Sequence, residues 1–405
     1  MRSQLLEKKS NKTIDTNKNN QKWPWWPLLP LYPYGRKRTF FKELIPKLVW
    51  SFEQLQGLYY VAVPIRLTVL KVQGGLMLFN PLPPTKELLE KLNDLIETYG
   101  PVKTIVLPTA SGLEHKISLP SLARCFPNAQ IWICPGQWSF PFSLPLKWLG
   151  IPPGRTKVLI KDGYPHEDSC KWISLGPLNI GLGRFQEIAC YHNISKSLLV
   201  TDAIVGISDE PPELFSLDPT PLLFHSREQG NEMLIDSTES RKKGWARLVL
   251  FASFLRPYPL SIPNLSTILL NSFKPGLRNA RSHFGVYPFA WDQNWNNSLD
   301  ELVGKNKPLL QVAPVIERLI FPRAKDTYMK WLDELTSLKG MKWLISSHYN
   351  APIPFSSREV KAFSRKISKR EWAKGSGNWK FLGTLDNILL KKNIVPTNPL
   401  QSLKD

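Results

Sequence analysis

Carboxylate and imidazole side chains follow three apolar runs of the sequence. Glu114 and His115 stand side by side after "TIVLP", Asp202 ends "KSLLVTD", and His348 ends "MKWLISSH". Functional groups of α/β proteins gather beyond the carboxyl ends of strands, because the loops there share one edge of a sheet. Two carboxylates and two imidazoles are a suitable ligand set for zinc or a similar divalent metal. The pattern leaves three interpretations open: one metal site, hydrogen-bonded pairs without a metal, and solvated loops.

The elements that must position these residues alternate between strand and helix. Residues rich in β-branched side chains predict strands at 59–72, 102–108 and 130–135, and leucines at helical spacing predict a helix over 85–100. A second, short helix is expected within 117–127. This alternation predicts an α/β fold. Later segments predict a β-hairpin at 186–202, a helix at 241–255, a helix at 328–338 and a strand at 341–348.

The composition is that of a protein with a large core. The chain has 405 residues, of which 42% are hydrophobic, and this is enough for one large domain or two ordinary ones. Its four cysteines form no CxxC pair, which argues against a zinc knuckle and predicts free thiols in a reducing compartment. The polar N-terminus does not resemble a secretory signal, and no run of about 18 apolar residues predicts a membrane span. We therefore expect a cytoplasmic location.

Positive charge is concentrated at the two ends of the sequence. The net charge is +20; residues 1–47 hold 11 Lys/Arg against 3 Asp/Glu, and residues 356–405 hold 11 against 4. Basic ends attract phosphate groups, as on an anionic membrane, or simply keep a chain in solution. No P-loop or dinucleotide fingerprint is present, and we do not expect specific nucleic-acid binding.

Four segments are expected along the chain. Residues 1–22 are Lys/Asn-rich and predicted to be disordered, 23–47 form a Trp/Pro-rich basic segment, 48–355 form the main domain, and 356–405 form a basic helix and tail. Prolines at every third position predict a polyproline II strip at 23–38. This strip either covers an apolar face of the protein or lies at a lipid surface beside the helix of 358–374, whose Val360, Phe363 and Ile367 share one stripe.

Seven stretches between Tyr59 and Ile353 resemble a known family in their order and spacing. They are "LFNPLPPT", "IVLPTASGLEHK", "FPNAQIWICPGQWSFP", "LLVTDAIV", "PLLFHSRE", "KGWARLVLF" and "SSHYNAPI". The sequence resembles the metallo-β-lactamase fold, and more closely an uncharacterised cyanobacterial and plastid family with a degenerate form of that fold. The resemblance implies an αββα four-layer sandwich with a site on one edge. It also implies a photosynthetic host, with the plastid stroma as an alternative location.

The resemblance divides the metal ligands of the fold into a lost set and a retained set. The motif His-x-His-x-Asp-His aligns with "ASGLEH", so that Ala110 and Gly112 replace two histidines while Glu114 and His115 match the final pair. A third histidine is missing near "GLGRFQE". The bridging Asp and the terminal His of the fold match Asp202 and His348. The resemblance therefore implies at most one metal, zinc or another divalent ion, held by Glu114, His115, Asp202 and His348.

Two functions are consistent with this pattern. The first is a metal-dependent hydrolase that acts on an ester, a thioester or a phosphoester of unknown identity. The second is a non-catalytic scaffold that docks on an anionic membrane or a protein partner through its basic, Trp-rich ends. Around the ligands, we expect Thr109, Arg184, Thr201 and His225 to line the pocket or to fill the lost metal position. Two aromatic clusters, at 136–142 and 287–291, are expected to pack in the core.

Overall fold

Two β-sheets form the centre of the molecule. The computed structural model describes residues 32–137, 144–181, 184–273, 276, 285–371 and 375–397, and all structural statements refer to these residues. The larger sheet has the order β1-β2-β3-β4-β5-β6-β7. Its strands are β1 (Phe40–Ile45), β2 (Val49–Leu58), β3 (Val61–Val72), β4 (Gly75–Phe79), β5 (Val102–Leu107), β6 (Gln130–Ile133) and β7 (Thr156–Val158). β1 to β4 pair antiparallel, and β4 to β7 pair parallel.

The second sheet has five strands in the order β16-β15-β10-β9-β8. They are β8 (Cys170–Asn179), β9 (Arg184–His192), β10 (Ser197–Val200), β15 (Trp343–Ser346) and β16 (Ile353–Pro354). The hairpin predicted at 186–202 is β9 and β10, which pair antiparallel. β10 pairs parallel with β15, so these two strands end at the same edge of the sheet.

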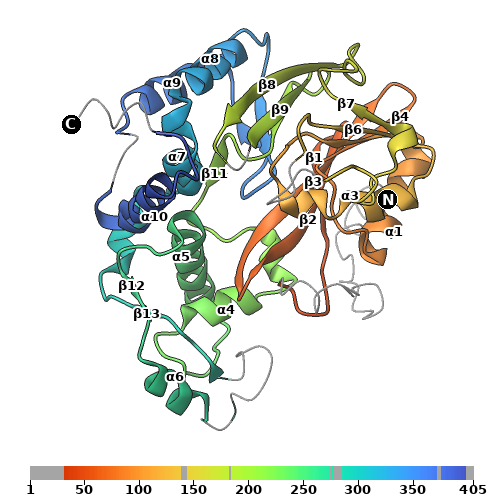
Figure 1. Ribbon diagram of the computed structural model, residues 1–405. Helices are drawn as coiled ribbons and strands as arrows, with labels where there is room; N and C mark the ends of the chain where they lie inside the picture. The colour runs from red at the N-terminus through yellow and green to blue at the C-terminus, as the bar shows by residue number, and fades with distance from the viewer. Residues whose placement is uncertain are drawn as a thin grey trace.

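Helices cover the outer faces of both sheets. α1 (Lys86–Tyr99) and α3 (Leu119–Cys125) pack on the seven-stranded sheet, and α8 (Lys325–Thr336) and α9 (Ser357–Ser368) pack on the five-stranded sheet (Figure 1). A separate hydrophobic cluster fills the space between the sheets, with side chains from β3, β4 and β5 facing side chains from β8, β9 and β10. The architecture is the predicted αββα sandwich.

Local sequence accounts for the helices that the pattern predicts. Thr85 caps α1 by accepting a hydrogen bond from the Leu88 N–H, and Gly100 ends the helix with φ 98°, a conformation that favours glycine. α9 begins with a capping box between Ser356 and Glu359. Its predicted stripe, Val360, Phe363 and Ile367, is buried against the body of the protein.

A third group of helices lies outside the two sheets. α4 (Thr220–Ser226), α5 (Thr238–Phe254) and α10 (Lys380–Lys391) enclose an aromatic-rich cluster, while α6 (Leu265–Ser272) lies at the far end of this region (Figure 1). α7 (Pro314–Leu319) connects it to the sandwich. Four short strands complete this region: β11 (Val205–Ile207), β12 (Leu260–Ser261), β13 (Ala290–Trp291) and β14 (Leu309–Gln311). Five 3₁₀ segments are Pro153–Arg155, Glu213–Ser216, Trp295–Ser298, Phe321–Arg323 and Gly377–Trp379.

The first sheet begins before residue 48, where the sequence predicts the start of the main domain. β1 lies within the segment 23–47, and its pairing with β2 makes it the edge strand of the larger sheet. The described part of the Trp/Pro strip, Tyr32–Arg38, packs on the protein: Tyr32 and Lys37 are buried. Residues 1–31 lie outside the described residues. Within the described residues, no helix is long and apolar enough to cross a lipid bilayer.

Candidate functional site

The four residues at the strand ends come from both sheets. Glu114 and His115 lie on α2 (Leu113–Lys116), a single helical turn that follows β5, where the sequence indicated a loop. Asp202 comes shortly after β10 and His348 shortly after β15. Because β10 and β15 are parallel neighbours, Asp202 and His348 reach the same edge, and α2 approaches this edge from the seven-stranded sheet.

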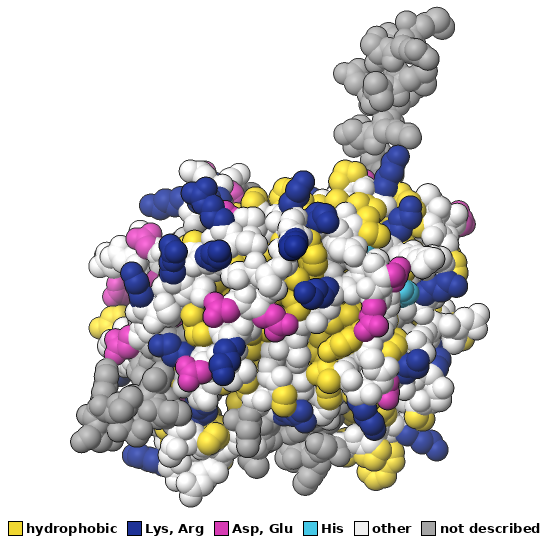
Figure 2. Space-filling model, turned by 90° about the horizontal axis from the view of Figure 1, so that it is seen from above, with side chains coloured by type: hydrophobic (Ala, Val, Ile, Leu, Met, Phe, Trp, Pro, Cys, Tyr) yellow, Lys and Arg dark blue, Asp and Glu magenta, His cyan; other side chains and the backbone are white. Residues whose placement is uncertain are grey.

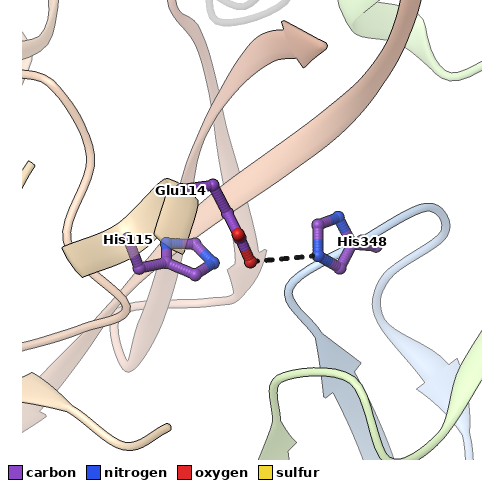
Figure 3. Close-up of side chains that lie close together, drawn as sticks. All are labelled: Glu114, His115 and His348. Atoms are coloured by element: carbon purple, nitrogen blue, oxygen red, sulfur yellow. Dashed lines mark ion pairs between the residues drawn. The ribbon is translucent and has the colours of Figure 1, made fainter. Parts of the chain in front are cut away.

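Three of the four side chains form a compact group. One donor atom from each of Glu114, His115 and His348 lies within 4.8 Å of the other two. The Glu114 carboxylate lies between the two imidazole rings, with Oε1 3.9 Å from His348 Nε2 (Figure 3). Asp202 joins the group through His348, whose Nε2 is 3.2 Å from Asp202 Oδ1. The structure therefore brings together all four residues that the sequence singles out.

Both imidazoles are oriented by backbone carbonyls. His115 Nδ1 is 3.0 Å from the Pro81 carbonyl oxygen, and His348 Nδ1 is 2.9 Å from the Pro64 carbonyl oxygen. A carbonyl can only accept, so each Nδ1 carries a proton and donates it. His115 Nε2 is buried and has no hydrogen-bond partner among the described residues. Orientation of a ring through Nδ1–H, with Nε2 left available, is the usual arrangement of a metal-binding histidine.

Burial and charge shift the pKa values within this group. Burial lowers the pKa of His115 to about 4, so its ring is neutral at pH 7. Burial also acts to lower the pKa of His348, but the hydrogen bond to Asp202 and the charges of Asp202 and Glu114 outweigh it and raise this pKa to about 9. Burial, followed by the charge of Asp202, raises the pKa of Glu114.

Glu187 holds the turn that carries Asp202, and the sequence analysis missed it. Its buried carboxylate accepts hydrogen bonds from the backbone N–H groups of Thr201, Asp202 and Ala203, at 2.6, 2.8 and 3.0 Å. Burial and the charge of Asp202 raise the pKa of Glu187 to about 7, against the effect of these three bonds. Glu187 lies in the middle of β9. A charged residue within an otherwise apolar strand was the sequence signal that could have indicated its buried role.

Arg66 on β3 fixes the loop that carries His348. Its buried guanidinium donates to the carbonyl of Ser346 and, at 2.6 Å, to the carbonyl of Tyr349. Glu53 on β2 accepts from Arg66 Nε at 2.9 Å and balances its charge. Together with the Pro64 carbonyl, these contacts connect the His348 loop to the opposite sheet. A lone arginine within the apolar strand of 61–72 was a signal for this role.

The four residues expected around the ligands have different surroundings. Thr109 Oγ1 accepts from the N–H groups of Ser111 and Gly112, and thereby shapes the turn before α2. Thr201 Oγ1 bonds to the Asn80 side chain. Both are buried beside the candidate site.

Arg184 and His225 do not line the site. The Arg184 guanidinium packs on Gly136, where an added Cβ would lie 2.6 Å from Nη1. His225 is neither a pocket residue nor a surface residue, since α4 buries it in the aromatic cluster with Nε2 3.0 Å from the Tyr60 carbonyl oxygen. These contacts place His225 in the aromatic cluster and away from the strand-end group. A role of Arg184 at the lost metal position stays a prediction.

Lys116 brings a charged group to the missing part of the motif. It is 4% exposed, and its ammonium donates to the Ala110 carbonyl at 2.7 Å. Burial lowers the pKa of Lys116 to about 8. Ala110 is the position where the motif of the resembled fold has its first histidine. This chain therefore buries an ammonium next to a position at which the resembled fold has a metal ligand.

A cleft of about 750 Å³ opens onto Glu114, Asp202 and His348. The ends of β2 and β3 form one wall, α2 forms another, and α5 and α7 lie opposite the β2–β3 hairpin (Figure 1). Most of its lining is apolar. The candidate site is thus accessible from outside, and its volume is that of a small-molecule site.

Glu114, His115, Asp202 and His348 form a small group of carboxylates and imidazoles at the edge of an αββα sandwich. A family model described as a domain of unknown function (DUF4336) matches residues 46–365, and the chain belongs to this family. No curated protein matches the chain in sequence.

Solved structures with similarity to this chain include several metallo-beta-lactamases. The enzyme from Hirschia baltica is 9% identical, with 83% of this chain and 100% of that chain covered, at a TM-score of 0.39. A mono-zinc form from Pseudomonas aeruginosa is 9% identical, with 82% and 97% covered, at a TM-score of 0.37. The enzyme from Pontibacter korlensis is 14% identical, with 42% and 73% covered, at a TM-score of 0.30.

Proposed function

We propose that Glu114, His115 and His348 hold one divalent metal ion, with Asp202 beside them, and that the protein is a metal-dependent hydrolase. The observation that carries this proposal is the buried His115 Nε2, which faces the group and lacks a partner among the described residues. If the group were only an ion pair between Asp202 and His348, the buried Nε2 of His115 would have lost its water without gaining a partner.

The donor set supports a site of the catalytic type. Two imidazoles and one carboxylate leave a position for water in the shell of a four-coordinate zinc, as hydrolytic zinc sites require. A bound metal would polarise a carbonyl oxygen and lower the pKa of a water. Asp202 and Glu114 place carboxylate oxygens at the floor of the cleft, where they can accept a proton from a nucleophilic water. Arg66 and Glu187 keep the His348 loop and the Asp202 turn in place.

Metal content of the purified protein tests the proposal. After exposure to zinc and gel filtration, we expect about one zinc per chain by elemental analysis. His348→Asn should lose most of it. His166→Asn is the matched control, because His166 lies outside the group, bonds to Thr104 and has φ 55°, which asparagine tolerates. Wild-type protein without zinc, or equal zinc in both variants, would contradict the metal site.

A second candidate function, peripheral docking on an anionic membrane, is favoured by the surface of α6. Leu265, Leu269, Leu270 and Phe273 are 77, 58, 74 and 67% exposed. Leucine and phenylalanine side chains exposed together are typical of interaction surfaces. The chain as a whole carries a net charge of +20. Lys and Arg side chains are spread over the face seen in Figure 2, which lies on the side opposite α6. An anionic membrane can bind both kinds of side chain: the apolar side chains insert between the lipids, and the basic side chains attract the negative headgroups.

Co-sedimentation with liposomes tests this second function. We expect salt-sensitive binding to phosphatidylglycerol liposomes and none to phosphatidylcholine liposomes, with a clear loss for Leu269→Ser/Leu270→Ser. Equal binding by wild type and the α6 double variant would remove α6 from the docking surface.

A further inference from the structure

The cleft above the candidate site has an unusual division of polarity. Glu114, Asp202 and His348 lie at its floor, and the remaining lining is dominated by aliphatic side chains of β2, β3, α2, α5 and α7. None of the described residues that line it is a lysine or an arginine, although the chain has 53 of them. A substrate with a phosphate or several carboxylates would meet the carboxylates of Glu114 and Asp202, while the positive charge of His348 is already paired with Asp202. The lining therefore selects against anionic substrates.

The apolar lining extends to the rim on two sides. Leu58, at the end of β2, is 56% exposed, and Leu113 and Ile117, at the two ends of α2, are 52 and 38% exposed. These side chains line the same cleft. Exposed aliphatic groups around a concave site offer a free-energy gain of about 25 cal/mol per Å² to an apolar ligand that covers them. Leu113 is the neighbour of Glu114 on α2, so one helical turn presents both the apolar rim and the polar floor.

We propose that this cleft binds the apolar chain of a neutral carboxylic ester, with the ester group at the Glu114–His348 end. This inference rests on the proposed hydrolase function and narrows its substrate class to acyl esters with an aliphatic chain. In the reaction, the oxygen of one water bonds to the acyl carbon and the bond from this carbon to the alkoxy oxygen breaks. One proton of the water passes to the leaving alcohol, so the products are a carboxylic acid and an alcohol, and no oxidant or reductant is needed.

Binding can be tested on the metal-free protein. The neutral probe N-phenyl-1-naphthylamine becomes fluorescent in apolar sites, and we expect it to bind and to be displaced by 1-decanol more readily than by decanoate, whose charge the floor disfavours. Ala252→Phe places a ring into the cleft from α5 and should weaken probe binding by about 10-fold or more. Ala246→Phe, on the same helix but outside the cleft lining, is the matched control and should bind as wild type does.

Hydrolysis by the zinc-loaded protein gives the second readout. We expect kcat/KM to rise at least 10-fold from 4-nitrophenyl acetate to the octanoate, since each buried CH₂ contributes about 0.8 kcal/mol, or about 4-fold. Ala252→Phe should flatten this dependence, because its ring takes the space of the acyl chain. Ala246→Phe, outside the cleft lining, should keep both the dependence and acetate hydrolysis. 4-Nitrophenyl phosphate should not be a substrate.

Probe binding and ester hydrolysis together distinguish a failure of the hydrolase proposal from a failure of the aliphatic-substrate proposal. Probe binding that Ala252→Phe abolishes, without hydrolysis of any ester, would overturn the hydrolase and keep the cleft as an apolar ligand site. Acetate hydrolysis without a chain-length preference would keep the hydrolase and overturn the aliphatic substrate. A wild-type protein that does not bind the probe, or equal losses in Ala252→Phe and Ala246→Phe, would also overturn the inference.

Discussion

Glu187 shows how one buried carboxylate organises several groups at once. Its two oxygens accept three backbone N–H bonds, and these bonds determine the direction in which Asp202 leaves the end of β10. A carboxylate is well suited to this task because it accepts at both oxygens and donates at neither. The amide of a glutamine would turn an N–H₂ group toward N–H donors.

Glu187→Gln is therefore expected to reduce both stability and metal binding. At pH 8, where the Glu187 carboxylate is ionised, we expect a loss of about 2 kcal/mol in the free energy of unfolding in urea, as for hydrogen bonds to charged groups. Zinc affinity should also fall, because Glu187 no longer holds the turn of Asp202 in position. Glu97→Gln, on the exposed face of α1, is the control and should change neither quantity. Unchanged zinc affinity in Glu187→Gln would show that the Asp202 turn does not need this anchor.

His225 should make the protein acid-sensitive. Its Nε2–H donates to the Tyr60 carbonyl, and its Nδ1 is buried without a partner among the described residues, so a second proton would have no acceptor there. Burial, together with the charges of Arg227 and Arg247, lowers its pKa to about 3 in the folded protein. The unfolded chain, with a pKa of about 6.5, binds this proton more readily. The contribution of His225 is therefore complete above pH 6.5 and is lost as the pH falls toward 3.

The expected loss between pH 7 and pH 5 is about 2 kcal/mol, at about 1.4 kcal/mol per pH unit below 6.5. Urea unfolding at the two pH values measures it. His225→Gln keeps a donor for Tyr60 but does not titrate, so its pH dependence should be smaller by this amount. His192, which burial also holds at a pKa of about 4, is present in both proteins and cancels in the comparison.

At the scale of elements, α5 and α4 touch without an intervening side chain. Gly244 in the middle of α5 faces the backbone of Leu222 on α4, and a Cβ added there would lie 1.8 Å from the Leu222 carbonyl oxygen. Glycine inside a helix costs about 1 kcal/mol relative to alanine. Here the close approach of two helices requires it.

Gly244→Ala should therefore destabilise the protein, although alanine has the higher helix propensity and would by itself stabilise α5. We expect a loss of about 2 kcal/mol or more in the free energy of unfolding, because backbone atoms of α4 must move. Gly154→Ala serves as the control, since a Cβ at Gly154 meets nothing within 4 Å; its stability should stay within about 0.5 kcal/mol of wild type. A stabilised Gly244→Ala would mean that α4 moves freely.

The elements that the sequence predicted well are those with a complete local signal. α1 has its cap at Thr85, its leucines at helical spacing and its stop at Gly100, so its limits followed directly. β2 was missed because Glu53, Gln54 and Gln56 interrupt its apolar pattern. These three are buried, and distant partners such as Arg66 compensate Glu53. α2 was missed because four residues are too few to show a period.

The candidate site was predictable for a related reason. Glu114, His115, Asp202 and His348 each follow a recognisable strand, so the strand ends, together with the resemblance to the metallo-β-lactamase fold, predicted that they would meet. Lys116, Glu187 and Arg66 were not predicted, because each acts through backbone atoms that sequence does not place. His225 was misplaced because α4, which is 7 residues long, was not predicted. α4 and the predicted helix α5 together bury His225 in the aromatic cluster.

At the scale of the whole molecule, the proposed ligands belong to two different sheets. Glu114 and His115 follow the seven-stranded sheet, and His348 follows the five-stranded sheet. A metal bound to all three would join the two halves of the sandwich. At 100 times its Kd, a ligand adds about 2.7 kcal/mol to stability. Zinc should therefore slow amide exchange by up to about 100-fold in β5 and in β15 alike, as mass spectrometry can measure. Slowing confined to one sheet would contradict a shared metal.

The bonds from Arg66 to the His348 loop also set an order of assembly. They join positions that are 280 and 283 residues apart in the sequence. Chains are synthesised from the N-terminus, and segments fold as they emerge. When β3, β5 and β10 have left the ribosome, Glu114, His115 and Asp202 are present but His348 is not yet made. The candidate centre thus becomes complete only when synthesis has passed β15, so a nascent chain that ends before β15 lacks His348, one of the three proposed ligands.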